Sequence, residues 1–306
     1  MATSARPDQL LVIIDPVARR TDGEAVRIAK DVLSAGAAAK VCLPEDAEEF
    51  ARVLARRGAR RPVVVGDDRA LTRAVTLLHR RRELAGCVLS MVPVGSALGV
   101  ARALGVPTGA VSAARAVLDG VERRLDLLVD DSDGVVLGAL RIPSVPGAPR
   151  VGGGGVPGGR GARGVTEASG ASGAAHGGAR EWLRTCQSLV RTLVPSRPGA
   201  GVSGGGPVGP ARLRVEVDGV VLVDLDQPVE AVTVTPGSAG VGGGVALVEV
   251  RPLSVGAAAT PLAARGRSVT VSGADFRYRV DAGVAGPVRR RTWVVREGAL
   301  GLVLPG

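Results

Sequence analysis

Between residues 10 and 107 the chain alternates short apolar runs with segments of helical period, and this pattern limits its fold most. The apolar runs are too short for helices, end at turn residues, and are typical of strands buried on both faces. They cover residues 10–15, 38–43, 62–66 and 87–93, and the helical segments cover residues 24–35, 46–58, 71–78 and 97–104. Strands that alternate with helices predict a parallel sheet built with right-handed crossovers.

The second half of the chain has a different pattern. Residues 124–142 and 212–306 contain short strand-like runs separated by turn signals, such as Asp218-Gly219 between two apolar runs. Regular short strands favour an antiparallel sandwich or barrel. We therefore predict an α/β fold class with two parts. Residues 1–107 form an N-terminal three-layer α/β domain of nucleotide-binding type, and residues 108–306 form a C-terminal antiparallel β-sandwich domain.

Two tracts rich in glycine interrupt the second part, at residues 144–180 and 195–210. Such composition buries too little apolar surface to offset chain entropy, so we predict that both tracts are disordered. Between them, residues 180–194 place their apolar side chains on one face of a helix. This helix would dock on the sandwich or, alternatively, contact a membrane.

The net charge of +10 is carried almost entirely by arginine, since Lys30 and Lys40 are the only lysines. Arginine in place of lysine, with abundant Ala, Gly and Val, is typical of GC-rich genomes. Basic runs interleaved with aromatic residues, which single-strand binders use, are missing from the sequence. We therefore predict no nucleic-acid partner, and an anionic membrane surface remains a candidate partner.

Cysteine usage and hydropathy point to a cytoplasmic protein. Cys42, Cys87 and Cys186 are scattered and odd in number, which fits packing residues in a reducing compartment. No apolar run reaches the roughly 18 residues of a membrane span, and we expect no signal peptide at the start of the chain.

Two strand-to-helix corners are candidate binding sites. In open α/β sheets, ligands bind at the carboxyl ends of strands, where helix N-termini can hold phosphate. One corner begins at Gly66 and includes Asp68, and the second, PVGSALG, offers Gly95 and Ser96. The alternative is that each corner is a plain turn, with Ser96 near a helix cap.

Other candidate sites are weaker. His79 and His176 have no second partner for a zinc site or a catalytic triad, and Asp130, Asp131 and Asp133 fit a hairpin turn better than a calcium loop. We therefore predict no metal site built from protein ligands alone.

The two corners resemble the catalytic region of the diacylglycerol kinase-like lipid kinases, a family that includes sphingosine kinases. That family has a Gly-Gly-Asp-Gly-Thr loop after the third strand, and residues 66–71 fall where this loop belongs. About 25 residues later the family has a Pro-x-Gly-Thr-x-Asn stretch that continues into Ala-Arg-x-Leu-Gly-Ile-Pro. The matching positions are Pro93, Gly95, Ala101, Arg102, Leu104, Gly105 and Pro107, with Ser96 in place of Thr.

The resemblance extends in order along the chain. The corner Asp15-Pro16 is similar to the family's Asn-Pro corner, and residues 123–140 resemble the beginning of its second domain. Near the end, Asp281 matches the acid of the family's Asp-Gly-Glu strand. The resemblance implies ATP and Mg²⁺ as cofactors, a lipid substrate, and a protein that works at the inner face of the membrane. It assigns nucleotide binding to Gly66, Asp68, Gly95 and Ser96, and catalysis to Asp281.

Several positions depart from the family pattern. Asp67 and Arg69 replace two glycines of the phosphate loop, where we expect them to resist the positive φ values that wrapping a phosphate needs. Ala70 replaces the Thr, Leu98 the Asn, and Gly283 the Glu that is the family's candidate general base. We therefore expect ATP-dependent phosphorylation of a lipid hydroxyl to be weak or lost. The alternative is a non-catalytic descendant that binds a nucleotide, a lipid or a protein.

Overall fold

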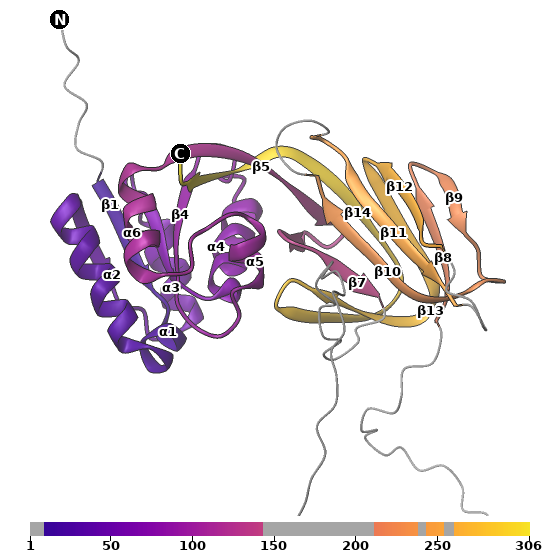
Figure 1. The fold of residues 1–306 in the computed structure, drawn as a ribbon, viewed down its shortest axis with the longest axis horizontal. Helices are drawn as coiled ribbons and strands as arrows, with labels where there is room; N and C mark the ends of the chain where they lie inside the picture. The colour runs from indigo at the N-terminus through magenta and orange to yellow at the C-terminus, as the bar shows by residue number, and fades with distance from the viewer. Residues whose placement is uncertain (1–8, 143–210, 238–242, 254–259) are drawn as a thin grey trace, which may run out of the picture. The chain divides into compact units, whose positions relative to one another are not determined.

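A computed structural model describes residues 9–142, 211–237, 243–253 and 260–306 (Figure 1). Both predicted glycine-rich tracts, the predicted helix at residues 180–194, His176 and Cys186 lie outside the described residues.

The N-terminal part contains the predicted parallel sheet, in the order β2-β1-β3-β4. Its strands are β1 (Gln9–Ile14), β2 (Ala38–Cys42), β3 (Arg61–Gly66) and β4 (Val88–Pro93). All three pairings between them are parallel. The four predicted strands are therefore confirmed, because their apolar side chains are needed on both faces of a covered sheet.

Helices cover both faces of this sheet. They are α1 (Pro16–Thr21), α2 (Gly23–Gly36), α3 (Ala47–Ala55), α4 (Asp68–Arg80), α5 (Gly99–Ala103) and α6 (Ala110–Asp119). Alternate residues of β1 lie in different cores. Leu10 and Val12 pack with α2 and α6, whereas Leu11 and Ile13 pack with α3 and α4. The predicted three layers are therefore present. Sequence patterns had not indicated α1 or α6.

The remaining strands form the β-rich part. They are β5 (Val121–Asp130), β6 (Val135–Val136), β7 (Leu140–Ile142), β8 (Ala211–Val217), β9 (Val220–Val223), β10 (Pro228–Pro236), β11 (Ala246–Pro252), β12 (Leu262–Gly266), β13 (Ser268–Val280) and β14 (Gly283–Leu304). Except where β14 meets β4, their pairings are antiparallel. Their core includes Tyr278 and Trp293, whose rings meet edge to face at 5.2 Å. The Asp218-Gly219 turn joins β8 to β9 as predicted, with φ of 49° and 82°.

The last strand belongs to both sheets. Sequence patterns predicted separate strands near the C-terminus, but β14 is continuous over 22 residues, with a register irregularity between Arg296 and Leu300. It pairs antiparallel with β13 and β5, and its end at Gly301 and Leu302 pairs parallel with β4. A domain boundary at residue 107 stays a prediction.

None of the helices among the described residues combines the length and apolar character that a bilayer crossing needs. Cys42 and Cys87 both pack in or against the core formed by α3 and α4. Burial raises the pKa of the Cys87 thiol, which fits a packing role.

Candidate functional site

The ends of β3 and β4 bring together the two corners predicted from the sequence. Gly66 lies opposite Pro93, and the Val94 amide donates to the Gly66 carbonyl at 2.9 Å. Gly95 has a φ of +126°, and a Cβ there would lie 3.2 Å from the Asp67 Cβ. A Cβ at Gly66 would lie 2.7 Å from the Ala70 Cβ. These glycines therefore allow the chain to pack closely against itself.

Asp67 is the N-cap of α4. Its carboxylate accepts from the amides of Arg69 at 3.0 Å and Ala70 at 3.2 Å. The backbone is extended at Asp67, with a φ of −89°, and Arg69 and Ala70 lie in the first turn of α4. Neither Asp67 nor Arg69 adopts a positive φ, because α4 begins directly after Asp67, and this is in line with the expected resistance of both residues to such values.

Asp68 connects α4 to α5. Its carboxylate accepts from the amides of Val100 at 2.8 Å and Ala101 at 2.9 Å, and its own amide donates to the Ala97 carbonyl. Leu98, which takes the N-cap position of α5, makes no side-chain cap bond. Asp68 therefore caps α5 from another helix, and only 3% of the residue is exposed.

Asp281 holds the loop between β6 and β7. Its carboxylate accepts from three consecutive amides, of Leu137 at 2.9 Å, Gly138 at 2.8 Å and Ala139 at 3.2 Å. Burial raises the pKa of Asp281, the three amides oppose this, and the negative charge of Asp68 raises it further. Both oxygens of the carboxylate predicted to be catalytic therefore accept hydrogen bonds from backbone amides of this loop.

Asp281 lies close to the α5 corner. A Cβ at Gly138 would lie 3.2 Å from Asp281 Oδ1 and 3.4 Å from a Val100 methyl. Val100 is one of the residues whose amide binds Asp68. The fold thus brings Gly66, Asp68 and Gly95 together at one sheet edge, with Asp281 nearby. Ser96 follows Gly95 and is exposed, and its hydroxyl makes no hydrogen bond within the described residues.

Asp15 is a further carboxylate at the same edge, which the sequence analysis matched to the family's Asn-Pro corner but did not assign to the site. Asp15 accepts from the Val17 amide at 2.8 Å, and Arg73 of α4 donates to its other oxygen at 2.7 Å. The Arg73 guanidinium also lies 5.6 Å from the centre of the Phe50 ring. The Asp15-Pro16 corner and its resemblance to the family's Asn-Pro corner were the sequence signals, and neither indicates Arg73 as the partner of Asp15.

The amides at this corner that could bind a phosphate are already paired. Asp67 and Asp68 take up amides at the starts of α4 and α5 that a phosphate would need. Within the part of the chain that is described, no three His, Cys, Asp or Glu side chains are grouped for a metal.

Asp130 lies in the turn that the sequence predicted. Its carboxylate accepts from the amides of Ser132 and Gly134.

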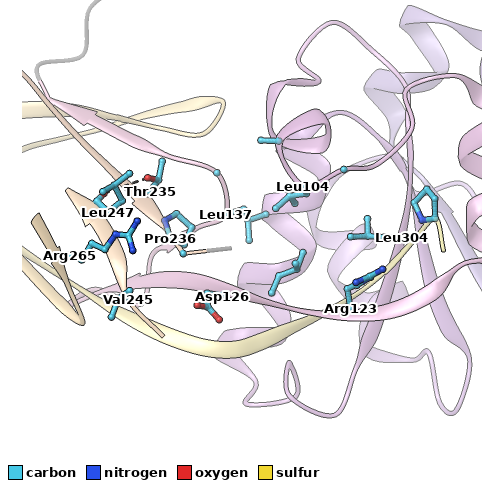
Figure 2. Close-up of a pocket in the computed structure, with 16 residues that line it drawn as sticks. Leu104, Arg123, Asp126, Leu137, Thr235, Pro236, Val245, Leu247, Arg265 and Leu304 are labelled. Carbon is cyan, nitrogen blue, oxygen red and sulfur yellow. Dashed lines mark hydrogen bonds between the residues drawn. The ribbon is translucent and has the colours of Figure 1, made fainter. Parts of the chain in front are cut away.

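A cavity of about 750 Å³ lies beside this site (Figure 2). The β10–β12 sheet contributes Thr235, Leu247 and Arg265, which the strand register places side by side. Leu104, Leu137 and Leu304 also line the cavity, as do Arg123 and Asp126 of β5. Sequence reasoning missed this cavity because its lining residues come from segments far apart in the chain.

The fold and site define a two-part protein with a parallel α/β region, an antiparallel β region and a polar corner at the carboxyl edge of the parallel sheet. Residues 9–129 match the family model for the diacylglycerol kinase catalytic domain. The resemblance found in the sequence is therefore confirmed: the first part of the chain is similar to the catalytic domain of the diacylglycerol kinases.

Solved structures share the whole fold. One is a diacylglycerol kinase from Bacillus anthracis str. Sterne, with a TM-score of 0.62 and 10% identity, covering 98% of each chain. Another structure from this strain, which also carries diacylglycerol kinase in its name, has a TM-score of 0.65 and 12% identity. It covers 99% of this chain and 98% of its own. No curated protein matches the sequence. At such low identity these structures support the fold, and the α/β plus β fold class is confirmed.

Proposed function

We propose that this chain is a non-catalytic member of the diacylglycerol kinase-like family that binds a small ligand and has lost ATP-dependent phosphoryl transfer to a lipid hydroxyl, or retains only a trace of it. The observation that carries this proposal is the position of Asp67 and Asp68. Each carboxylate accepts two backbone amides at the start of a helix, α4 for Asp67 and α5 for Asp68.

Phosphate binding at a helix start depends on unpaired amides and a positive dipole end. Here the carboxylates of Asp67 and Asp68 already pair these amides and place a negative charge at the positive end of each helix. A phosphate at this corner would have to displace Asp67 or lie against it. Two like charges 4 Å apart repel by about 4 kcal/mol at an effective dielectric near 20, which corresponds to roughly three decades of affinity.

The proton-accepting group is compromised as well. Phosphoryl transfer needs an oriented nucleophile and stabilised charge, and a base that receives the hydroxyl proton. Asp281 accepts three backbone amides, and Gly283 stands where the family pattern has Glu. Both parts of the machinery are therefore altered in one chain.

The second candidate is a residual lipid kinase, and one observation favours it. Burial and Asp68 raise the pKa of Asp281, which is the direction that suits a general base. In that case Gly66, Asp68, Gly95 and Ser96 would surround ATP and Mg²⁺, and a diacylglycerol-like lipid at the membrane would be the substrate.

Calorimetric titration with ATP and Mg²⁺, together with a diacylglycerol phosphorylation assay, tests the proposal. We expect no saturable ATP binding at millimolar concentration and turnover near background. Turnover at a rate typical of an active kinase would overturn the proposal and leave the second candidate standing.

A repaired variant sharpens this test. Asp67→Gly, Arg69→Gly, Ala70→Thr and Gly283→Glu should together raise ATP affinity if the corner is an altered phosphate site. Position 283 has room for a side chain, since the nearest atom to a Cβ there is 3.6 Å away. Asp22→Gly removes the cap of α2, far from this corner in the sequence, and should leave ATP affinity unchanged.

A further inference from the structure

Two exposed leucines lie at the start of β10. Leu225 is in the turn before this strand and Leu253 follows β11, and the two residues are 46% and 42% exposed. The Leu253 amide donates to the carbonyl of Pro228, the first residue of β10, at 2.9 Å. Arg212 is the register partner of Pro228 and donates to the Leu225 carbonyl at 3.1 Å. Leu225, Pro228 and Leu253 therefore belong to one surface, which we call the apolar end.

Residues 143–210, which lie outside the described residues, are attached on both sides beside this surface. β7 ends at Ile142, which pairs with Val232 of β10. β8 begins at Ala211, which pairs with Val229 of β10. The two attachment points are thus three positions apart along one strand, at 229 and 232. Every part of the segment between them is therefore tethered to the start of β10.

Residues 180–194 within this segment have an apolar face that could cover the leucines. At helical period their apolar side chains fall on one side. These side chains are Trp182, Leu183, Cys186, Leu189, Val190 and Leu193. Arg180, Arg184 and Arg191 fall on the opposite side, where they would stay in water when the apolar face is covered.

The connection between residue 194 and β8 is short enough to keep this face near the apolar end. It consists of residues 195–210, which are mostly Gly, Pro, Ser and Ala. A flexible connection of 16 residues has an r.m.s. end-to-end distance of about 22 Å, and it gives an effective concentration on the order of millimolar. An apolar contact too weak to hold a separate partner can therefore form within one molecule.

The charges around the apolar end favour a basic segment over an anionic membrane surface. Asp226 follows Leu225, and Glu230 lies in β10. Both acids are exposed, and within the described ranges neither side chain makes a hydrogen bond or an ion pair. Arg212, by contrast, donates to the carbonyls of Leu225 and Asp226. Unpaired carboxylates attract the arginines of residues 180–194 and repel acidic lipid headgroups.

We propose that residues 180–194 dock on the apolar end of the same molecule, with their apolar face over Leu225 and Leu253. The docking removes from water two leucines that the β-rich part otherwise exposes side by side. None of these residues belongs to the polar corner, so the docking and the loss of catalysis can fail separately.

The reactivity of the Cys186 thiol in the full chain tests the docking. In a Cys42→Ser protein the only other thiol is that of Cys87, which is buried, so Ellman's reagent reports on Cys186. Leu225→Ser combined with Leu253→Ser should raise the reaction rate about tenfold or more, because two leucine side chains no longer cover the segment. Equal rates before and after this double substitution would overturn the proposal.

Matched substitutions locate the contact. Leu43→Ser makes the same exchange at a leucine that follows β2 and is 50% exposed, and it should leave the rate unchanged. Leu189→Ser, on the apolar face of the segment, should raise the rate as much as the double substitution does. Combining the two should add nothing further, because both remove one contact. Gln187→Ser lies on the opposite face and should have no effect. Additive effects would show that the segment and the apolar end do not touch, and would overturn the proposal.

Two further measurements separate other occupants of the apolar end. The rate should stay constant when the protein is diluted about a hundredfold, since docking within one molecule does not depend on concentration. A rise on dilution would assign the protection to a second copy and overturn the proposal. Vesicles of phosphatidylglycerol and phosphatidylcholine should also leave the rate unchanged. A thiol that reacts fast alone and slowly with vesicles would place the segment on a membrane, which equally overturns docking.

Discussion

Two neighbouring regions differ in whether their charged side chains have partners: the polar corner at the ends of β3 and β4, and the cavity beside it. At the corner, the carboxylates of Asp67 and Asp68 each accept two backbone amides, and Asp15 pairs with Arg73. In the cavity, Arg123 and Arg265 have no such partner within the described residues. The corner satisfies its polar groups internally, whereas the cavity leaves cations exposed.

This difference separates groups that hold the fold from groups that could hold a ligand. Buried amides must be paired. The corner carboxylates pair them in the ligand-free protein and therefore contribute to the stability of the fold. An exposed arginine with no partner contributes little to stability, so replacing it should affect binding alone. The four predictions below test the corner side of this comparison.

Asp68→Ala should have the largest effect, a loss of about 3 kcal/mol in the free energy of unfolding. The substitution leaves the buried amides of Val100 and Ala101 without an acceptor, and each such group costs about 1–3 kcal/mol. Urea unfolding measures the loss. Asp22→Ala removes an exposed cap of α2 and should cost only about 1 kcal/mol. Similar losses in both variants would show that Asp68 is an ordinary cap.

Gly66→Ala should lower the free energy of unfolding by about 2 kcal/mol, because overpacking typically costs about 1–3 kcal/mol. The added Cβ would lie 2.7 Å from the Ala70 Cβ and 3.0 Å from the Asp15 Cβ. Gly86→Ala is the control, since a Cβ there meets nothing within 4 Å. If Gly66→Ala unfolds like the control, the close approach of β3 and α4 at this corner is not required.

Asp281→Asn should alter the pH dependence of stability. The pKa of Asp281 is raised in the folded state, so its contribution is greatest below its ordinary value of 3.8 and is lost as pH rises through the folded value. Between these two pKa values, the free energy of unfolding of the parent protein should therefore fall relative to that of the variant by about 1.4 kcal/mol for each pH unit.

Urea unfolding of both proteins from pH 3.5 to 8 measures this difference. Asn tolerates the φ of 47° at position 281, and Asp218→Asn controls for the same exchange at a similar φ of 49° in an exposed turn. A parent protein that gains stability over Asp281→Asn with rising pH would contradict the raised pKa.

Asp67→Gly should have the smallest effect on stability, a few tenths of a kcal/mol, because glycine is a tolerated N-cap. It should also open the start of α4 to an anion, so that pyrophosphate raises the melting temperature of the variant and leaves the parent unchanged. Asp46→Gly opens α3 instead, where Glu48 and Glu49 in the first turn should repel the anion. An equal response of both variants would contradict a phosphate-type corner at Gly66.

The sequence by itself determined the local elements of this protein. Continuous apolar runs at residues 10–15 and 62–66 specified strands covered on both faces, and Asp46 and Gly58 marked the bounds expected for a helix that the structure places at Ala47–Ala55. The Asp218-Gly219 turn was also predictable, because few residue pairs tolerate two consecutive positive φ values. These features depend on neighbours in the chain, and periodicity reports them.

Only the tertiary structure decided what the polar residues of the site contact. Asp281 binds the amide of Leu137 across 144 positions, and Asp68 binds that of Val100 across 32. The row of Arg265, Leu247 and Thr235 exists only because β10, β11 and β12 pair in one register. Both kinds of contact, a helix capped by a distant carboxylate and a row of cross-strand neighbours, depend on how the elements pack. The local sequence around each residue does not indicate which distant residue it will contact.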